Sequence, residues 1–139
     1  MVVASETVRR SHGNRAEAIV ASCLSRAGWR VLGRQVRIGR DEIDIVALDP
    51  GPPPTLVAVE VRSATSSRFG APEERLDARK VGRIYRAARG LRTVGILPDG
   101  SRLPRLAWRI DVVLVEVRPS LAAGIGGPVV RHLRGVRPD

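Results

Sequence analysis

Two apolar stretches joined by a proline-rich turn constrain the fold of this chain more than any other feature. Residues 41–47 and 56–62 are rich in valine and isoleucine, and residues 49–54 between them consist largely of proline. Such stretches favour buried β-strands, and proline and glycine favour the turn that joins them. We therefore predict a β-hairpin over residues 41–62.

Each strand of this hairpin carries an acidic residue in its apolar stretch, Asp44 in the first and Glu60 in the second. If the hairpin is symmetric about Pro52, positions that sum to 104 pair, and Asp44 lies opposite Glu60 with Cβ atoms about 5 Å apart. Two facing carboxylates repel unless a divalent cation lies between them. The pair therefore predicts a metal site, and a surface-facing or salt-bridged pair is the alternative.

The remaining elements follow from hydrophobic periodicity and turn residues. We expect a helix from Asn14 to Gly28 that buries Cys23, a strand over 29–38 and, in the hairpin, a shared face for Ile43, Ile45 and Ala47. A second helix starts after a cap at Asp77, and a strand follows at 108–117. The predicted fold is α/β: a central mixed sheet flanked by helices in the order α-β-β-β-α-β.

The predicted boundaries are a flexible leader at 1–13, one folded domain at 14–118 and a tail at 119–139. The tail is rich in glycine and proline and has one possible edge strand at 129–136. No stretch approaches the length of a membrane span, and the lone Cys23 excludes an intramolecular disulfide. We expect a cytoplasmic protein with no membrane partner.

The chain of 139 residues has a formal net charge of +10, which favours nucleic acid as a partner. Almost all of this charge is arginine, since Lys80 is the only lysine. Aromatic residues make up 3% of the chain, too few for a surface that binds single strands mainly by base stacking. Basic residues gather on the second helix and before it, where they suit phosphate contacts or form a plain solvated face: Arg68, Arg79, Lys80, Arg83 and Arg86.

The order of these motifs resembles the YraN-like family of uncharacterised bacterial proteins, which are similar to archaeal Holliday junction resolvases. The resemblance spans residues 13–136. The matching pieces are Gly13 with Glu17, residues 42–47, residues 59–62, residues 68–74, Lys80, residues 109–113 and His132.

The resemblance implies a restriction-endonuclease-like fold with a Mg²⁺ or Mn²⁺ site. Asp44, Glu60 and the carbonyl of Val61 would be the metal ligands. Glu17 would approach the same site from the first helix, or else form a capping box with Asn14. Arg62 stands where the nuclease motif has lysine, so it could hold a phosphate but could not act as a base.

The implied function is a Mg²⁺-dependent, structure-selective DNA endonuclease that acts on branched DNA, with a homodimer as one option. The alternative is a non-catalytic nucleic-acid-binding protein that keeps the nuclease fold. Glu42 could assist the metal or be a surface residue, and Lys80 is expected mainly on the solvated surface. Arg109 and Asp111 predict an internal ion pair, and neither His12 nor His132 is assigned to a metal.

Overall fold

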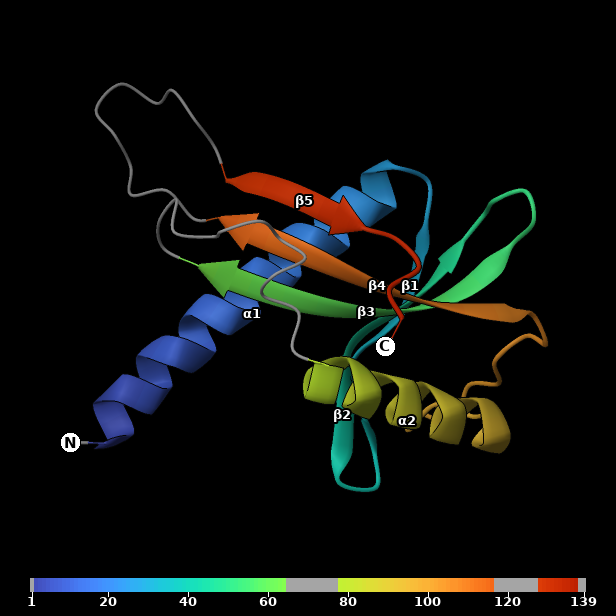
Figure 1. Cartoon of the computed structure of the whole chain (residues 1–139), viewed down its shortest axis with the longest axis horizontal. Helices are drawn as coiled ribbons and strands as arrows, with labels where there is room; N and C mark the ends of the chain where they lie inside the picture. The colour runs from blue at the N-terminus through green and yellow to red at the C-terminus, as the bar shows by residue number, and fades with distance from the viewer. Residues whose placement is uncertain (1, 65–77, 117–127, 138–139) are drawn as a thin grey trace.

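The structure, a computed structural model, describes residues 2–64, 78–116 and 128–137 (Figure 1). Two helices and five strands follow one another as α1 (Val2–Arg26), β1 (Arg30–Ile38), β2 (Asp41–Asp49), β3 (Thr55–Ala64), α2 (Ala78–Val94), β4 (Ala107–Glu116) and β5 (Val129–Leu133). The strands form one sheet in the order β1-β2-β3-β4-β5. Only β3 and β4 are parallel. The predicted mixed sheet flanked by helices, with an additional edge strand, is confirmed.

The β2–β3 hairpin has the predicted register. Its described pairs run from Ile45↔Val59 to Asp49↔Thr55, and every pair sums to 104. The strands on either side of the turn are apolar enough to be fully buried, so a shift of one residue would expose their side chains. The predicted register is therefore confirmed up to Ile45 and Val59.

The two helices cover opposite faces of the sheet, and each closes its own hydrophobic core. On one face, α1 packs Ala16, Val20 and Leu24 against β2, β3 and β4. On the other face, α2 packs side chains such as Ile84 and Leu91 against Val36, Val46 and Ala58. The sheet is thus buried on both sides, which explains the nearly continuous apolar runs of β3 and β4.

The first helix begins earlier than predicted. It starts at Val2, so Asn14 lies inside the helix and does not cap it. Once a helix is nucleated, each further residue adds a hydrogen bond, and the packed half can extend through a segment that has no apolar repeat. Its other end agrees with the prediction, since Gly28 has a φ of 90° and follows the last turn.

Two predicted side-chain positions are wrong. Cys23 is exposed, because the buried stripe of α1 follows the four-residue spacing of Ala16, Val20 and Leu24 and leaves Cys23 on its flank. In β2, Ile43 packs in the core under α2, whereas Ile45 packs in the core under α1.

The alternation of β2 therefore breaks at Asp44. The β1 partners of Ile43 and Ile45 are Val36 and Arg34, and Gln35 lies between them. Gln35 has a φ of 49°, outside the extended range of a regular strand. The irregular backbone at Gln35 thus coincides with the point where β2 changes its buried face.

No helix in the described part of the chain is both long and apolar enough to cross a membrane. Residues 65–77 lie outside the described residues, and with them the predicted helix cap Asp77 and the predicted phosphate contact Arg68.

Candidate active site

The predicted acidic pair lies at the point where β2 and β3 separate. The ladder has no described pair beyond Ile45↔Val59. At this point the Asp44 carboxylate takes the place of a backbone hydrogen-bond partner from β2. Oδ2 of Asp44 accepts a hydrogen bond of 2.8 Å from the backbone N–H of Val61. The side chains of Asp44 and Glu60 interact, and each changes the pKa of the other. The structure therefore brings the two predicted acids together.

This contact changes the proton affinity of both groups. Burial is the largest cause that raises the pKa of Glu60, and the negative charge of Asp44 raises it further, to about 8. Burial also raises the pKa of Asp44, while the hydrogen bonds from Val61 and Glu60 oppose that rise. The interaction between the two acids raises the pKa of Glu60 and, against the effect of burial, lowers the pKa of Asp44. Glu60 is therefore the acid that holds the proton. Without a cation, the pair shares one proton at neutral pH.

The backbone of Val61 completes the set of oxygen groups at this point. In an antiparallel ladder the N–H and C=O of one residue point to the same side of the strand. The N–H of Val61 points to Asp44, so its carbonyl also points toward the β2 side, past the last described ladder pair. Two carboxylates and a carbonyl are hard oxygen ligands of the kind that Mg²⁺ binds.

Glu17 reaches the neighbourhood of this pair from α1. Its side chain is buried, and its Oε1 accepts a hydrogen bond of 3.1 Å from Nε of Arg34. Burial raises the pKa of Glu17, and the negative charge of Asp44 adds to the rise although Arg34 opposes it. The capping box with Asn14 does not form, because Asn14 instead accepts a hydrogen bond of 2.8 Å from Gln35.

Glu17 does not extend the acidic pair into a larger metal cluster. Within the described ranges, no three His, Cys, Asp or Glu side chains converge closely enough to hold one ion. The oxygen groups of the sequence prediction that could hold a metal are the carboxylates of Asp44 and Glu60 and the carbonyl of Val61. Arg34 and Gln35 were not predicted as site residues, and the only sequence signal for them is their place opposite Asp44 in the meander.

Glu60 also opens onto a cavity of about 200 Å³ between the β1–β2 turn and the start of α2. Basic and acidic side chains mix around it, together with the apolar Ile84: Arg40, Asp41, Glu42, Glu60, Lys80 and Arg83. The positive charge of Lys80 lowers the pKa of Glu60 and so opposes the effect of burial. Lys80 is exposed, as expected, but it also lines the cavity of the acidic pair. The cavity is thus lined by acidic and basic side chains together.

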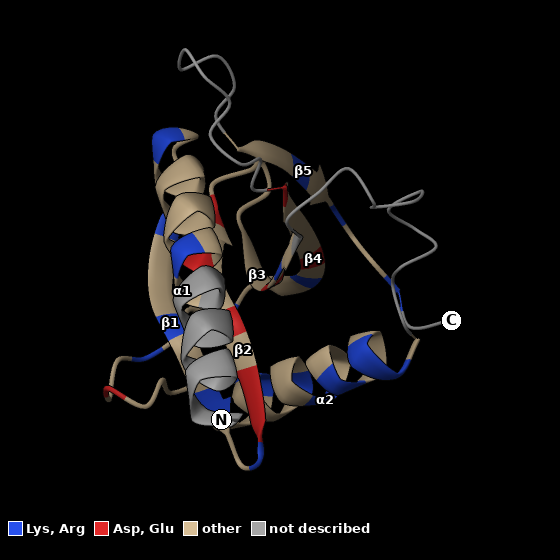
Figure 2. Cartoon of the chain, turned by 90° about the vertical axis from the view of Figure 1, so that its left-hand side faces the viewer, with Lys and Arg blue, Asp and Glu red and all other residues tan. Residues whose placement is uncertain are grey.

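The other predicted residues divide between this cavity and its surroundings. Arg62 follows Val61 on β3, and its charge lowers the pKa of both Glu60 and Asp44. Arg86 holds Asp41 through bonds of 2.8 and 2.7 Å. Arg79 is exposed at the start of α2, and Glu42 is exposed and pairs with Arg37 at 3.5 Å. Lys and Arg residues occur along the whole of α2 (Figure 2).

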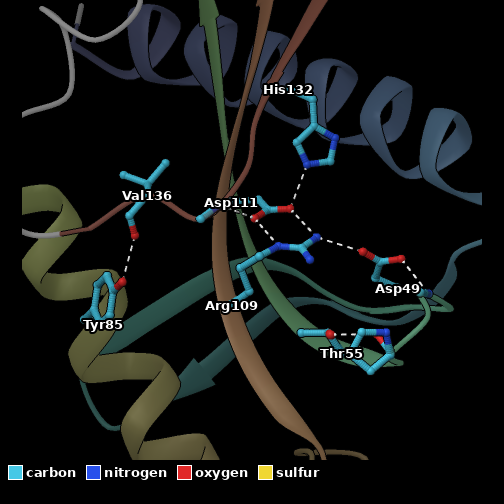
Figure 3. A network of polar contacts seen from close by, with 10 residues as sticks. Asp49, Thr55, Tyr85, Arg109, Asp111, His132 and Val136 are labelled. Atoms are coloured by element: carbon cyan, nitrogen blue, oxygen red, sulfur yellow. Dashed lines mark hydrogen bonds and ion pairs between the residues drawn. The ribbon is translucent and has the colours of Figure 1, made fainter.

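A second polar group lies on the other face of the sheet and has a structural role (Figure 3). Arg109 binds both carboxylate oxygens of Asp111 at 2.8 and 3.0 Å and reaches Asp49 at 2.9 Å, so the predicted internal ion pair is confirmed. Nε2 of His132 lies 2.8 Å from Oδ2 of Asp111. The backbone N–H of Gly135 donates a hydrogen bond of 3.0 Å to Oδ1 of the same carboxylate. The fully buried Asp111 therefore ties β5 and its C-terminal extension to β4.

The charge of Asp111 is stabilised by these partners. Burial opposes ionisation, but the hydrogen bonds from His132, Arg109 and Gly135 outweigh it and hold the pKa of Asp111 below its ordinary value. The Asp111 side chain shares the α1 face with its β3 partner Val59, whereas Glu60 points to the opposite face. This group is thus separate from the acidic pair.

Comparisons with known proteins support the YraN-like family that the sequence motifs indicate. The profile of the uncharacterised protein family UPF0102 matches residues 16–115. A UPF0102 protein of Arthrobacter sp. (strain FB24) is 37% identical over 89% of this chain and 93% of its own length. A UPF0102 protein of Moorella thermoacetica is 41% identical over 84% of this chain and 91% of its own length. One of Chlorobaculum parvum is 40% identical over 74% of this chain and 73% of its own length. The chain belongs to the uncharacterised family UPF0102, the YraN-like family that its motifs predict.

Proposed function

We propose that this protein is a Mg²⁺-dependent DNA endonuclease that hydrolyses phosphodiester bonds in branched DNA, as its resemblance to Holliday junction resolvases implies. The observation that carries the proposal is the meeting of Asp44 and Glu60 at the end of the β2–β3 ladder, where the N–H of Val61 holds the Asp44 carboxylate. Two half-buried carboxyl groups side by side, one of which keeps its proton at neutral pH, are unfavourable for a purely structural contact. They are suited to a cation that replaces that proton.

Asp44, Glu60 and the Val61 carbonyl would hold the ion. An ion with only two protein carboxylates and one carbonyl keeps several waters, which is typical of Mg²⁺ in phosphoryl-transfer sites. When bound, it supplies a Lewis acid that activates water and neutralises charge on the phosphate. The N–H of Val61 fixes the orientation of the Asp44 carboxylate, so this ligand is already in place before the ion arrives.

The cations around the acidic pair would bind the substrate. Lys80 and Arg83 line the same cavity as Glu60 and could hold the phosphate on each side of the scissile bond. Arg62 remains protonated, so its role is to stabilise negative charge that develops on the phosphate. Glu17, held by Arg34, would add negative charge behind Asp44 and strengthen cation binding.

A second candidate function rests on Arg62. A chain with arginine in the place of the motif lysine could keep the fold and bind nucleic acid without cleaving it. This alternative predicts salt-dependent DNA binding that survives in Asp44→Asn and Glu60→Gln variants, with no metal-dependent cleavage by the wild-type protein.

The experiment that tests the proposal is incubation of a four-way junction, a flap and a linear duplex with the protein and Mg²⁺ or Mn²⁺. We expect cleavage of a branched substrate by the wild type, and loss of cleavage in Asp44→Asn and in Glu60→Gln. Asp99→Asn is the matched control, because it removes an exposed acid that lies outside the cavity of the acidic pair. Cleavage that is unchanged in Glu60→Gln would contradict the proposal. If cleavage requires paired incisions, the active form would be a symmetric homodimer.

A further inference from the structure

Two basic grooves continue from α2 away from the candidate active site. The first, about 610 Å³, lies between α2 and β4, and its lining includes Tyr85, Arg89 and Arg92. The second, about 820 Å³, lies between the C-terminal end of α2 and the segment before β4. Both grooves include Arg92 and Trp108, so they meet at these two residues.

An ion pair connects the grooves to the cavity of Glu60. Arg86 lines the first groove, and Asp41 lines the cavity. The guanidinium of Arg86 binds both oxygens of Asp41, at 2.8 and 2.7 Å, so the two depressions are adjacent. A chain-like ligand could therefore pass from Glu60 over Arg86 to Trp108 without leaving the protein surface.

The charges along this path suit a polyanion. Every charged residue of the two groove linings is an arginine: Arg86, Arg89, Arg92, Arg102, Arg105 and Arg109. Arg86 pairs with Asp41, and Arg109 pairs with Asp49 and Asp111. The other four are exposed, and no ion pair joins them to another described residue. These four guanidinium groups are thus available for phosphates.

The shared point of the two grooves carries an aromatic ring. Trp108 is half-buried, since it packs partly against the core under α2. Tyr85 lies in the first groove and is fixed there by a hydrogen bond of 2.8 Å from its hydroxyl to the carbonyl of Val136. Val94 and Ile96 add apolar surface to the second groove and are 62% and 44% exposed.

Arginines that follow a groove, together with an accessible aromatic ring, are the features of single-strand binding sites. In a duplex the base faces stack on one another, so they cannot stack on Trp108. The aromatic content of the whole chain is low, as the sequence indicates, but two of its few rings lie in these grooves. Phosphate contacts would therefore supply most of the affinity, and one stacked base would supply the preference for an unpaired strand.

We infer that the two grooves form a strand track that binds an unpaired DNA strand leading away from the Glu60 cavity. The track names the form of the substrate, a branched DNA with a single-stranded arm, and in that respect it rests on the proposed nuclease function. Binding itself requires neither a metal nor cleavage. The two ideas can therefore fail separately.

The test is fluorescence anisotropy of a labelled single-stranded oligonucleotide in EDTA, with the full chain and over a range of salt. The Arg89→Ala/Arg92→Ala double variant should bind about tenfold more weakly than the wild type. Its slope of log affinity against log salt should fall by about 1.4, about 0.7 for each lost phosphate contact. The matched control is Arg26→Ala/Arg30→Ala, which removes the same charge from exposed positions near the end of α1.

Tryptophan emission gives a second readout that does not depend on removing a packed ring. Trp29 is buried, whereas Trp108 lines the track. Single-stranded DNA should quench the emission of the wild type, and the quenching should disappear in Trp108→Phe, which keeps an aromatic ring in the core contact. A duplex of the same sequence should bind more weakly and quench less.

Three results would each overturn the strand track: equal losses in the double variant and its control, quenching that persists in Trp108→Phe, or equal affinity for duplex and single strand. Binding through the track without cleavage of any substrate would reject the proposed nuclease function and leave the track in place. Cleavage of a branched substrate, together with unchanged single-strand binding by Arg89→Ala/Arg92→Ala, would support the nuclease function and reject the strand track.

Discussion

The backbone N–H of Val61 donates a hydrogen bond of 2.8 Å to Oδ2 of Asp44, at the point where β2 and β3 separate. A side chain thus takes the place of a ladder partner, and this fixes the Asp44 carboxylate against the neighbouring strand. Glu60 immediately precedes Val61, so the same strand segment presents the second acid to the first. The acidic pair is therefore a product of the hairpin itself and does not depend on the position of either helix.

The first prediction concerns stability against pH in the absence of metal. The pKa of Glu60 is about 8 in the folded state and 4.5 without the fold, so the folded state binds the proton more tightly. The stability that this proton contributes is complete below pH 4.5 and is lost as pH rises through about 8. The urea midpoint in EDTA should therefore fall between pH 5.5 and pH 9, and less so in Glu60→Gln.

The matched control for this prediction is Asp99→Asn, which removes an exposed acid outside the cavity of the acidic pair. It should keep the pH dependence of the wild type. A pH dependence that is equal in the wild type and in Glu60→Gln would show that the two acids do not share a proton.

The second prediction concerns cation binding. An ion at Asp44 and Glu60 must displace their shared proton, so Mn²⁺ should raise the melting temperature more at pH 8 than at pH 6. A concentration of one hundred times the dissociation constant adds about 2.7 kcal/mol to the free energy of unfolding. Asp44→Asn should remove most of this effect in a thermal shift titration. A Mn²⁺ effect that persists in Asp44→Asn would place the cation elsewhere.

The third prediction concerns the lysine of the cavity. The nuclease motif has a lysine where this chain has Arg62. Lys80, the only lysine of the chain, lines the same cavity as Glu60, so its amine can take the role of that motif lysine. Lys80→Ala should lower kcat about 100-fold, the order found when one donor to a developing charge is lost. Adding Arg62→Lys to this variant should recover part of the loss. Arg30→Ala, a charge change outside the cavity, should leave kcat unchanged.

The fourth prediction concerns the buried group around Asp111. Asp111→Asn leaves Arg109 without its closest counter-charge and should lower the free energy of unfolding by about 3–5 kcal/mol. Arg86→Ala, which breaks the more exposed pair with Asp41, should lower the free energy of unfolding much less. Urea denaturation measures both. Equal small losses would mean that the buried ion pair contributes no more than the surface pair.

The depressed pKa of Asp111 gives this group the opposite pH dependence to Glu60. Its folded pKa lies below 3.8, so the stability that it contributes is present above that pH and is lost as pH falls further. Acid unfolding should therefore begin at a higher pH in a variant that lacks His132, such as His132→Phe.

The local pattern of the sequence is enough to predict the sheet and the acidic pair. The register of the hairpin follows from two largely apolar strands and a short turn, and it brings Asp44 and Glu60 to the same end of the ladder. The edge strand and the Arg109–Asp111 pair also follow from alternation. These features depend on neighbours along the strand, which a sequence pattern records.

Features set by packing between distant elements could not be predicted in this way. The exposure of Cys23 depends on which flank of α1 meets the sheet, and the place of Ile43 depends on the backbone at Gln35. The contacts of Arg34 with Glu17 and of His132 with Asp111 join residues far apart in the chain. The meeting of Lys80 with Glu60 depends on how α2 packs over the sheet.

The most direct test of the acidic pair is anomalous diffraction from crystals soaked in Mn²⁺ above pH 8, where Glu60 has lost its proton. We predict one manganese peak within about 2.2 Å of a carboxylate oxygen of Asp44, a carboxylate oxygen of Glu60 and the carbonyl oxygen of Val61. Crystals without any peak at this position, in which Glu60 remains hydrogen-bonded to Asp44, would contradict the metal site.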